Sequence, residues 1–162
     1  MAYIKNGKLA DAEKLAQTIA RPQAKLFALT EVAIAYRNNS SKSNQLFRQA
    51  LTIARSQSDV SLRDLSLQTL ISAHLQVGQL EQALQLTRSL KFPHPPTLRL
   101  VIEAYHKAGK SAQARQLLSQ ELGAIKLLSD SWEQRIRLSD LIRTPVAIEH
   151  FDWIRQEWAI IS

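Results

Sequence analysis

One short spacing recurs along the chain and limits what it can fold into. A ring-bearing residue is followed four positions later by Gly and nine positions later by Ala. The three full copies are Tyr3, Gly7 and Ala12; His74, Gly78 and Ala83; and Tyr105, Gly109 and Ala114. A degenerate copy starts at Tyr36, lacks the Gly and has Ser43 in the place of the Ala. Repetition at intervals of about 20–50 residues is typical of proteins that stack one structural unit several times.

Apolar residues on either side of these turns recur at the spacing of an α-helix. Before one turn they fall at positions i, i+3, i+4 and i+7, namely Leu67, Leu70, Ile71 and His74. A second apolar stripe begins after each turn, at the Ala or Ser. Such stripes are typical of helices that bury one face, Gly readily ends a helix, and Ala lets two helix axes approach closely. The repeat therefore predicts pairs of helices joined by short turns.

The predicted helices account for most of the chain. They span residues 8–20, 23–37, 42–57, 60–77, 79–91, 95–108, 110–128, 131–143 and 146–160. Every Pro falls between these segments or at a helix start, where it does no harm. With only 4 Gly and 5 Pro in 162 residues, the composition argues against a turn-rich β-sandwich or barrel. We therefore expect an all-α fold.

The repeated spacing resembles that of the tetratricopeptide repeat over about residues 3–126. The best-fitting copy comprises Leu98, Val101, Ile102, Tyr105, Gly109 and Ala114. The resemblance implies a right-handed α-solenoid of antiparallel helix hairpins, in which the first helix of each hairpin lines a concave face. The initial Trp of that family is missing from every copy, and the intervals are uneven.

The two ends of the chain depart from the repeat. Residues 1–126 are expected to form the repeats, and residues 127–162, which hold all three Trp, to form C-terminal capping helices of the same structural unit. Met1–Asn6 supplies only the last turn of a first helix, which favours a piece cut from a longer solenoid. Near the other end, Trp158, Ile160 and Ile161 predict an apolar patch suited to self-association.

The resemblance implies that a peptide or partner protein binds on the concave face. Carried over by position, the lining residues are Thr30, Arg37, Asn38, Gln68, Ser72, Gln76, Arg99, Glu103, His106 and Lys107. They alternate with the buried stripes, so their side chains should face away from the core. A surface that mixes amides and cations suits an extended or acidic peptide. We therefore expect a non-enzymatic protein–protein interaction scaffold whose partner is another protein or peptide.

Charge leaves one alternative open. The net charge is +7, and residues 1–126 hold 17 Lys and Arg against 8 Asp and Glu. Segments such as Thr69–Gly78 and Leu100–Gly109 also resemble the first helix of pentatricopeptide repeats. That resemblance implies binding of single-stranded RNA in a basic groove, although Gln68 and Arg99 are not that family's usual base-reading residues. RNA binding is therefore the alternative function.

Signals for catalysis, cofactors and membranes are missing from the sequence. There is no Cys, and the four His do not form a metal-binding pair. Ala104–Ser111 loosely matches a phosphate-binding loop, but it follows a helical stripe rather than a strand, so we interpret it as a turn between helices. We expect no enzyme activity, no metal and no cofactor. Without a signal peptide or a long apolar run, we expect a cytoplasmic protein with no membrane insertion.

Overall fold

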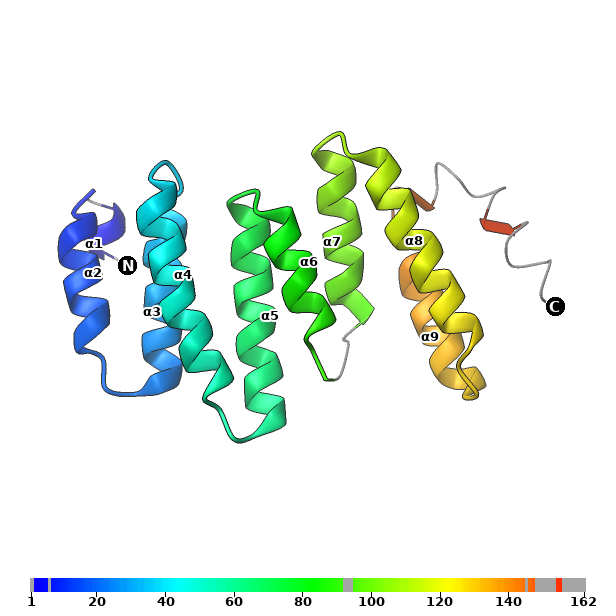
Figure 1. The fold of residues 1–162 in the computed structure, drawn as a ribbon, viewed down its shortest axis with the longest axis horizontal. Helices are drawn as coiled ribbons and strands as arrows, with labels where there is room; N and C mark the ends of the chain where they lie inside the picture. Colours follow the sequence, from blue (N-terminus) through cyan, green and yellow to red (C-terminus); the bar gives the residue numbers. More distant parts are fainter. Residues whose placement is uncertain (1, 6, 92–94, 145, 148–153, 156–162) are drawn as a thin grey trace. The chain divides into compact units, whose positions relative to one another are not determined.

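The computed structural model describes residues 2–5, 7–91, 95–144, 146–147 and 154–155. Regular structure in these ranges is entirely α-helical and contains no strand, so the predicted all-α class is confirmed. The chain divides into two compact units, Met1–Phe92 and Pro93–Ser162. Figure 1 shows the helices of each unit. No described helix has both the length and the apolar character needed to cross a membrane.

The first unit consists of helices that pack side by side. Its elements are α1 (Ala2–Lys5), α2 (Leu9–Thr18), α3 (Pro22–Ala35), α4 (Ser40–Arg55), α5 (Val60–Gln76) and α6 (Leu80–Arg88). Helix α3 packs against α2, α4 and α5, while α5 packs against α3, α4 and α6. The observed bounds of α2 to α6 lie within three residues of the predicted ones, because the apolar stripes and the turns are local signals.

Helix ends in the first unit follow from single residues. Pro22 is the first residue of α3, where its missing N–H costs nothing. The Asn39 side chain accepts a hydrogen bond from Lys42 N at the start of α4, and Asp59 accepts one from Leu62 N at the start of α5. Gly78 has a φ of +75° in the turn before α6, as the repeat predicted.

The core of the first unit is built from the predicted stripes. Side chains with no exposed surface include Leu26, Leu29, Ala33, Leu46, Ala50, Leu70 and Ala83. Ser43, which replaces Ala in the degenerate copy, is buried as well, and its hydroxyl donates to Ala33 O over 2.9 Å. A small residue is needed here because α3 and α4 approach closely, and the hydroxyl is tolerated because it is satisfied.

The second unit contains α7 (Pro95–Lys107), α8 (Ser111–Lys126) and α9 (Ser131–Leu141), each of which packs against the other two. Val101, Ile102, Ala114, Leu118 and Ile125 have no exposed surface and form its core. Asp130 begins α9 by accepting hydrogen bonds from two backbone N–H groups.

Three sequence predictions fall on this second unit. The phosphate-loop-like segment comprises the end of α7, the turn at residues 108–110 and the first residue of α8, with Gly109 at a φ of +74°, so its interpretation as a connection between helices is confirmed. The division between repeats and cap at residue 126 stays a prediction. Most of the predicted helix over 146–160, and the predicted apolar patch of Trp158, Ile160 and Ile161, lie outside the described residues.

Candidate functional site

The predicted lining residues of the first unit have different surroundings. Ser72 and Gln76 are exposed on α5, and Gln68 is half-buried there. Arg37 and Asn38 are exposed in the turn after α3. Thr30 is only 2% exposed, and its hydroxyl donates to Leu26 O over 2.8 Å. The expectation that Thr30 faces away from the core is wrong, because it lies on the buried side of α3 with its hydrogen bond satisfied within the helix.

The remaining predicted residues lie on α7 in the second unit. Arg99 forms ion pairs with Glu103 on the same helix and, over 3.4 Å, with Asp140 on α9. Two carboxylates therefore neutralise the positive charge of Arg99, which the sequence predicts to contact a partner protein. His106 is half-buried, with its Nδ1 atom 3.5 Å from the Ser111 hydroxyl, while Lys107 is exposed. On this helix Arg99 and Glu103 are engaged with each other, Arg99 also with α9, and His106 contacts the start of α8.

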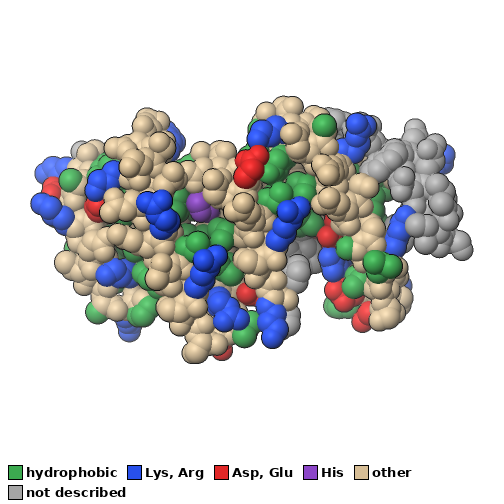
Figure 2. Space-filling view, viewed as in Figure 1, with side chains coloured by type: hydrophobic (Ala, Val, Ile, Leu, Met, Phe, Trp, Pro, Cys, Tyr) green, Lys and Arg blue, Asp and Glu red, His purple; other side chains and the backbone are tan. Residues whose placement is uncertain are grey.

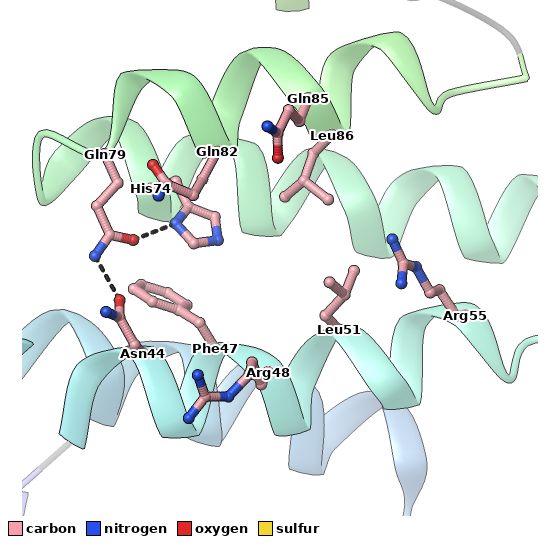
Figure 3. Close-up of a pocket in the computed structure, with 10 residues that line it drawn as sticks. All are labelled: Asn44, Phe47, Arg48, Leu51, Arg55, His74, Gln79, Gln82, Gln85 and Leu86. Carbon is pink, nitrogen blue, oxygen red and sulfur yellow. Dashed lines mark hydrogen bonds between the residues drawn. The ribbon is translucent and has the colours of Figure 1, made fainter. Parts of the chain in front are cut away.

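A groove that the sequence did not single out lies in the first unit, between α4 and α6. Both helices pack against α5, and the side chain of His74 on α5 reaches the groove (Figure 3). Its volume is about 310 Å³. The lining residues are Asn44, Phe47, Arg48, Leu51, Arg55, His74, Gln79, Gln82, Gln85 and Leu86. We call this the α4–α6 groove.

The floor of the α4–α6 groove is apolar. The side chains of Leu51 and Leu86 point toward each other from the two helices (Figure 3). Beside them, Phe47 is 3% exposed and its ring packs against the imidazole of His74, with 4.3 Å between the ring centroids. An apolar side chain placed between the two leucines would bury apolar surface that is otherwise exposed to water, and the free energy gained is proportional to the area buried.

A chain of hydrogen bonds closes one end of the groove. Gln79, at the start of α6, does not cap its helix with its side chain. Instead its Nε2 donates to Asn44 Oδ1 over 2.7 Å, and its Oε1 lies 2.6 Å from His74 Nδ1 (Figure 3). Burial lowers the pKa of His74 below its usual value, and the contact with Gln79 only partly opposes this. The imidazole is therefore neutral at physiological pH and holds α4, α5 and α6 together.

The rim of the α4–α6 groove is basic. Arg48 and Arg55 are exposed on α4, and in the part of the chain that the structure describes neither forms an ion pair. Across the groove, Gln82 and Gln85 are exposed on α6. Figure 2 shows hydrophobic side chains exposed on this face of the first unit with Lys and Arg side chains around them. Residues 1–92 hold twelve Lys and Arg against six Asp and Glu, so the surrounding potential is positive as well.

The groove has the chemistry of a binding site. It combines an apolar floor, amides that donate and accept hydrogen bonds, and two guanidinium groups. Its lining contains no carboxylate, hydroxyl or thiol to act as a nucleophile or general base beside the buried His74. Among the described residues, no group of His, Cys, Asp and Glu is arranged to hold a metal ion.

Comparisons with known proteins add no family to this description. The chain shows no significant similarity to a protein-family model, a curated protein or a solved structure.

Proposed function

We propose that this chain is a non-enzymatic protein-interaction module that binds a peptide segment of a partner protein. In this proposal the helix pairs form a tetratricopeptide-like, right-handed solenoid of antiparallel hairpins. The α4–α6 groove is the observation that carries the proposal, because its apolar floor and polar rim offer what a peptide side chain and backbone both need. The second candidate surface for the same function is the exposed side of α3 and α5, the first helices of their hairpins in this proposal. On this surface, which we call the first-helix face, Ser72 and Gln76 on α5 and Arg37 after α3 are exposed.

A peptide fits the groove better than single-stranded RNA does. Proteins that bind single strands stack the bases on exposed aromatic rings. Phe47, the aromatic residue of the groove, is 3% exposed and covered by His74. The groove thus has cations for a phosphate backbone but no platform for a base, so RNA remains the alternative that the experiment below includes.

Selection from a random-peptide phage library tests the proposal directly. We expect the immobilised chain to enrich a family of related peptides. Two variants with a bulky residue at an exposed position separate the candidate surfaces: Gln82→Trp narrows the α4–α6 groove, and Ser72→Trp occupies the first-helix face. We expect the first variant to lose binding of the enriched peptides by about tenfold or more, and the second to retain it.

Three results would contradict parts of this proposal. If no peptide is enriched, the chain is not a peptide-binding module. If Ser72→Trp loses binding and Gln82→Trp retains it, the site is the first-helix face. If a random pool of single-stranded RNA is retained instead, with an affinity that falls steeply as salt is added, the RNA alternative holds.

A further inference from the structure

We infer that the occupant of the α4–α6 groove is an acidic amphipathic segment, with an apolar side chain between Leu51 and Leu86 and carboxylates against Arg48 and Arg55. This inference rests on the proposed function and adds the chemical class of the ligand. Three features of the groove support this inference. The arginines are exposed and unpaired within the described residues, the floor is apolar, and the other polar groups are neutral.

The two arginines are available to a ligand and share a face of α4. Arg48 and Arg55 are seven residues apart, which is two helical turns or about 10 Å along the axis. Both are exposed, and neither meets a carboxylate within the described residues. By contrast, Lys42 on the same helix is paired with Glu13 over 2.9 Å. The positive charge on the groove side of α4 is therefore left without a partner among the described residues of its unit.

Leu51 lies between these arginines in sequence and faces Leu86 across the groove. A volume of about 310 Å³ lies at the lower end of the range for ligand pockets, so it holds a few side chains rather than a whole chain. A ligand that fills it must place an apolar side chain over the leucines while its flanking residues reach the rim. Because the arginines stand on either side of Leu51 along α4, those flanking residues meet guanidinium groups.

The other polar groups of the groove do not select for charge. Gln82 and Gln85 each offer both donors and acceptors, so they bond equally well to acidic, neutral and basic segments. His74 is neutral and already bonded to Gln79. Arg48 and Arg55 thus decide the preference, because guanidinium–carboxylate hydrogen bonds are charge-assisted and a basic segment would be repelled.

The composition of peptides enriched from the random library tests this inference. We expect them to carry net negative charge around at least one large apolar residue. We expect the pair Arg48→Glu with Arg55→Glu to weaken their binding by at least about tenfold, and added salt to weaken binding to the unchanged chain. The matched control is Lys14→Glu with Arg21→Glu, which makes the same change in net charge at two exposed positions outside the groove and should bind as the unchanged chain does.

A charge swap adds a stricter requirement. Peptides in which every Glu and Asp is replaced by Lys should bind the Arg48→Glu, Arg55→Glu variant better than they bind the unchanged chain. Circular dichroism and thermal unfolding verify that this variant folds, and Arg48→Gln with Arg55→Gln provides a milder version that should also lose acidic peptides.

The outcomes separate the inference from the proposed function. Enrichment of neutral or basic peptides, or of acidic peptides whose binding survives both arginine substitutions, overturns the acidic ligand while leaving a peptide-binding module in place. If no peptide is enriched at all, both fail.

Discussion

The imidazole of His74 packs against the ring of Phe47 at a tilt of 34° between the two planes, with 4.3 Å between the ring centroids. Its Nδ1 atom contacts Gln79 Oε1, and this contact links α5, which carries His74, to the start of α6. This packing removes most of the imidazole from water, and that burial lowers its pKa. His74 is thus a structural link whose charged form the folded state disfavours.

The first unit should therefore lose stability in mild acid. The folded pKa of His74 lies below the unfolded value near 6.5, so between these two values the unfolded chain binds a proton that the folded chain does not. Stability contributed by the neutral ring is complete above about pH 6.5 and falls as the pH drops toward the folded pKa. Urea unfolding at a series of pH values from about 7.5 to 5 should show this decline.

His74→Tyr provides the control, because Tyr105 occupies the corresponding place of another sequence copy and is buried there. Tyrosine does not titrate in this range. The variant should therefore lose the decline between about pH 6.5 and 5, whatever its stability at neutral pH. An unchanged pH profile would show that other groups cause the decline.

The helices were predictable because their signals are local. A stripe such as Leu67, Leu70 and Ile71 needs no distant partner to indicate a buried helix face, and Gly78 marks the end of α5 through its own backbone conformation. These features place α2 to α9 within about three residues of their observed bounds. Element order and the alternation of helix and turn follow from the sequence for the same reason.

The surroundings of individual polar side chains were not predictable in the same way. Arg99 meets Asp140, a residue forty-one positions away, and Thr30 is buried by neighbouring helices although it is polar. Position on a helix wheel predicts which face a residue occupies, but it does not say which other helix supplies a counter-ion or covers that face. At least three of the ten predicted lining residues, Thr30, Arg99 and Glu103, therefore have roles within the fold.

The α4–α6 groove had a partial signal in the sequence. Arg48, Leu51 and Arg55 lie on one face of α4, which the helical period alone reveals. The opposite wall comes from Gln82 and Leu86 on α6, and nothing in the sequence says that these two helices leave a space between them. The hollow depends on how both helices pack around α5, which is a tertiary property.

Leu15 and Leu46 occupy the same place of the repeat, three residues after its small residue, yet they differ in burial. Leu46 has no exposed surface, whereas Leu15 is 54% exposed, because α1 is only four residues long and does not cover it. Leu46→Ala should destabilise the chain by about 2–5 kcal/mol, and Leu15→Ala by less than about 1 kcal/mol. Urea unfolding of both variants measures the difference, provided that the slope of the unfolding free energy against urea concentration stays the same.

If Leu46→Ala and Leu15→Ala lower the free energy of unfolding equally, Leu15 is covered in solution. In that case a titration of protein concentration distinguishes burial against a second copy from burial within one chain, because only the former makes the midpoint rise with concentration.

Arg99 should act in folding of the second unit rather than in binding. Its removal leaves the carboxylates of Glu103 and Asp140 close together without their shared cation. Arg99→Gln should therefore destabilise the chain by about 1–2 kcal/mol. Lys107 lies about two turns farther along α7, is exposed, and forms no ion pair among the described residues. Lys107→Gln should therefore change stability by less than about 0.5 kcal/mol. If Arg99→Gln is as stable as Lys107→Gln, the two ion pairs contribute nothing measurable.

Two glycines of the second unit should respond to alanine with opposite signs. Gly109 has a φ of +74° in the turn between α7 and α8, whereas Gly123 lies inside α8. A Cβ at either position meets no atom within 4 Å, so the backbone alone decides the effect. Gly109→Ala should cost about 1 kcal/mol because an L-residue is strained in the left-handed region, and Gly123→Ala should stabilise by about 0.5–1 kcal/mol because alanine loses less entropy in a helix. Thermal unfolding of the two variants beside the unchanged chain should show melting temperatures that shift in opposite directions, and a shift of the same sign would mean that one of these backbone conformations differs in solution.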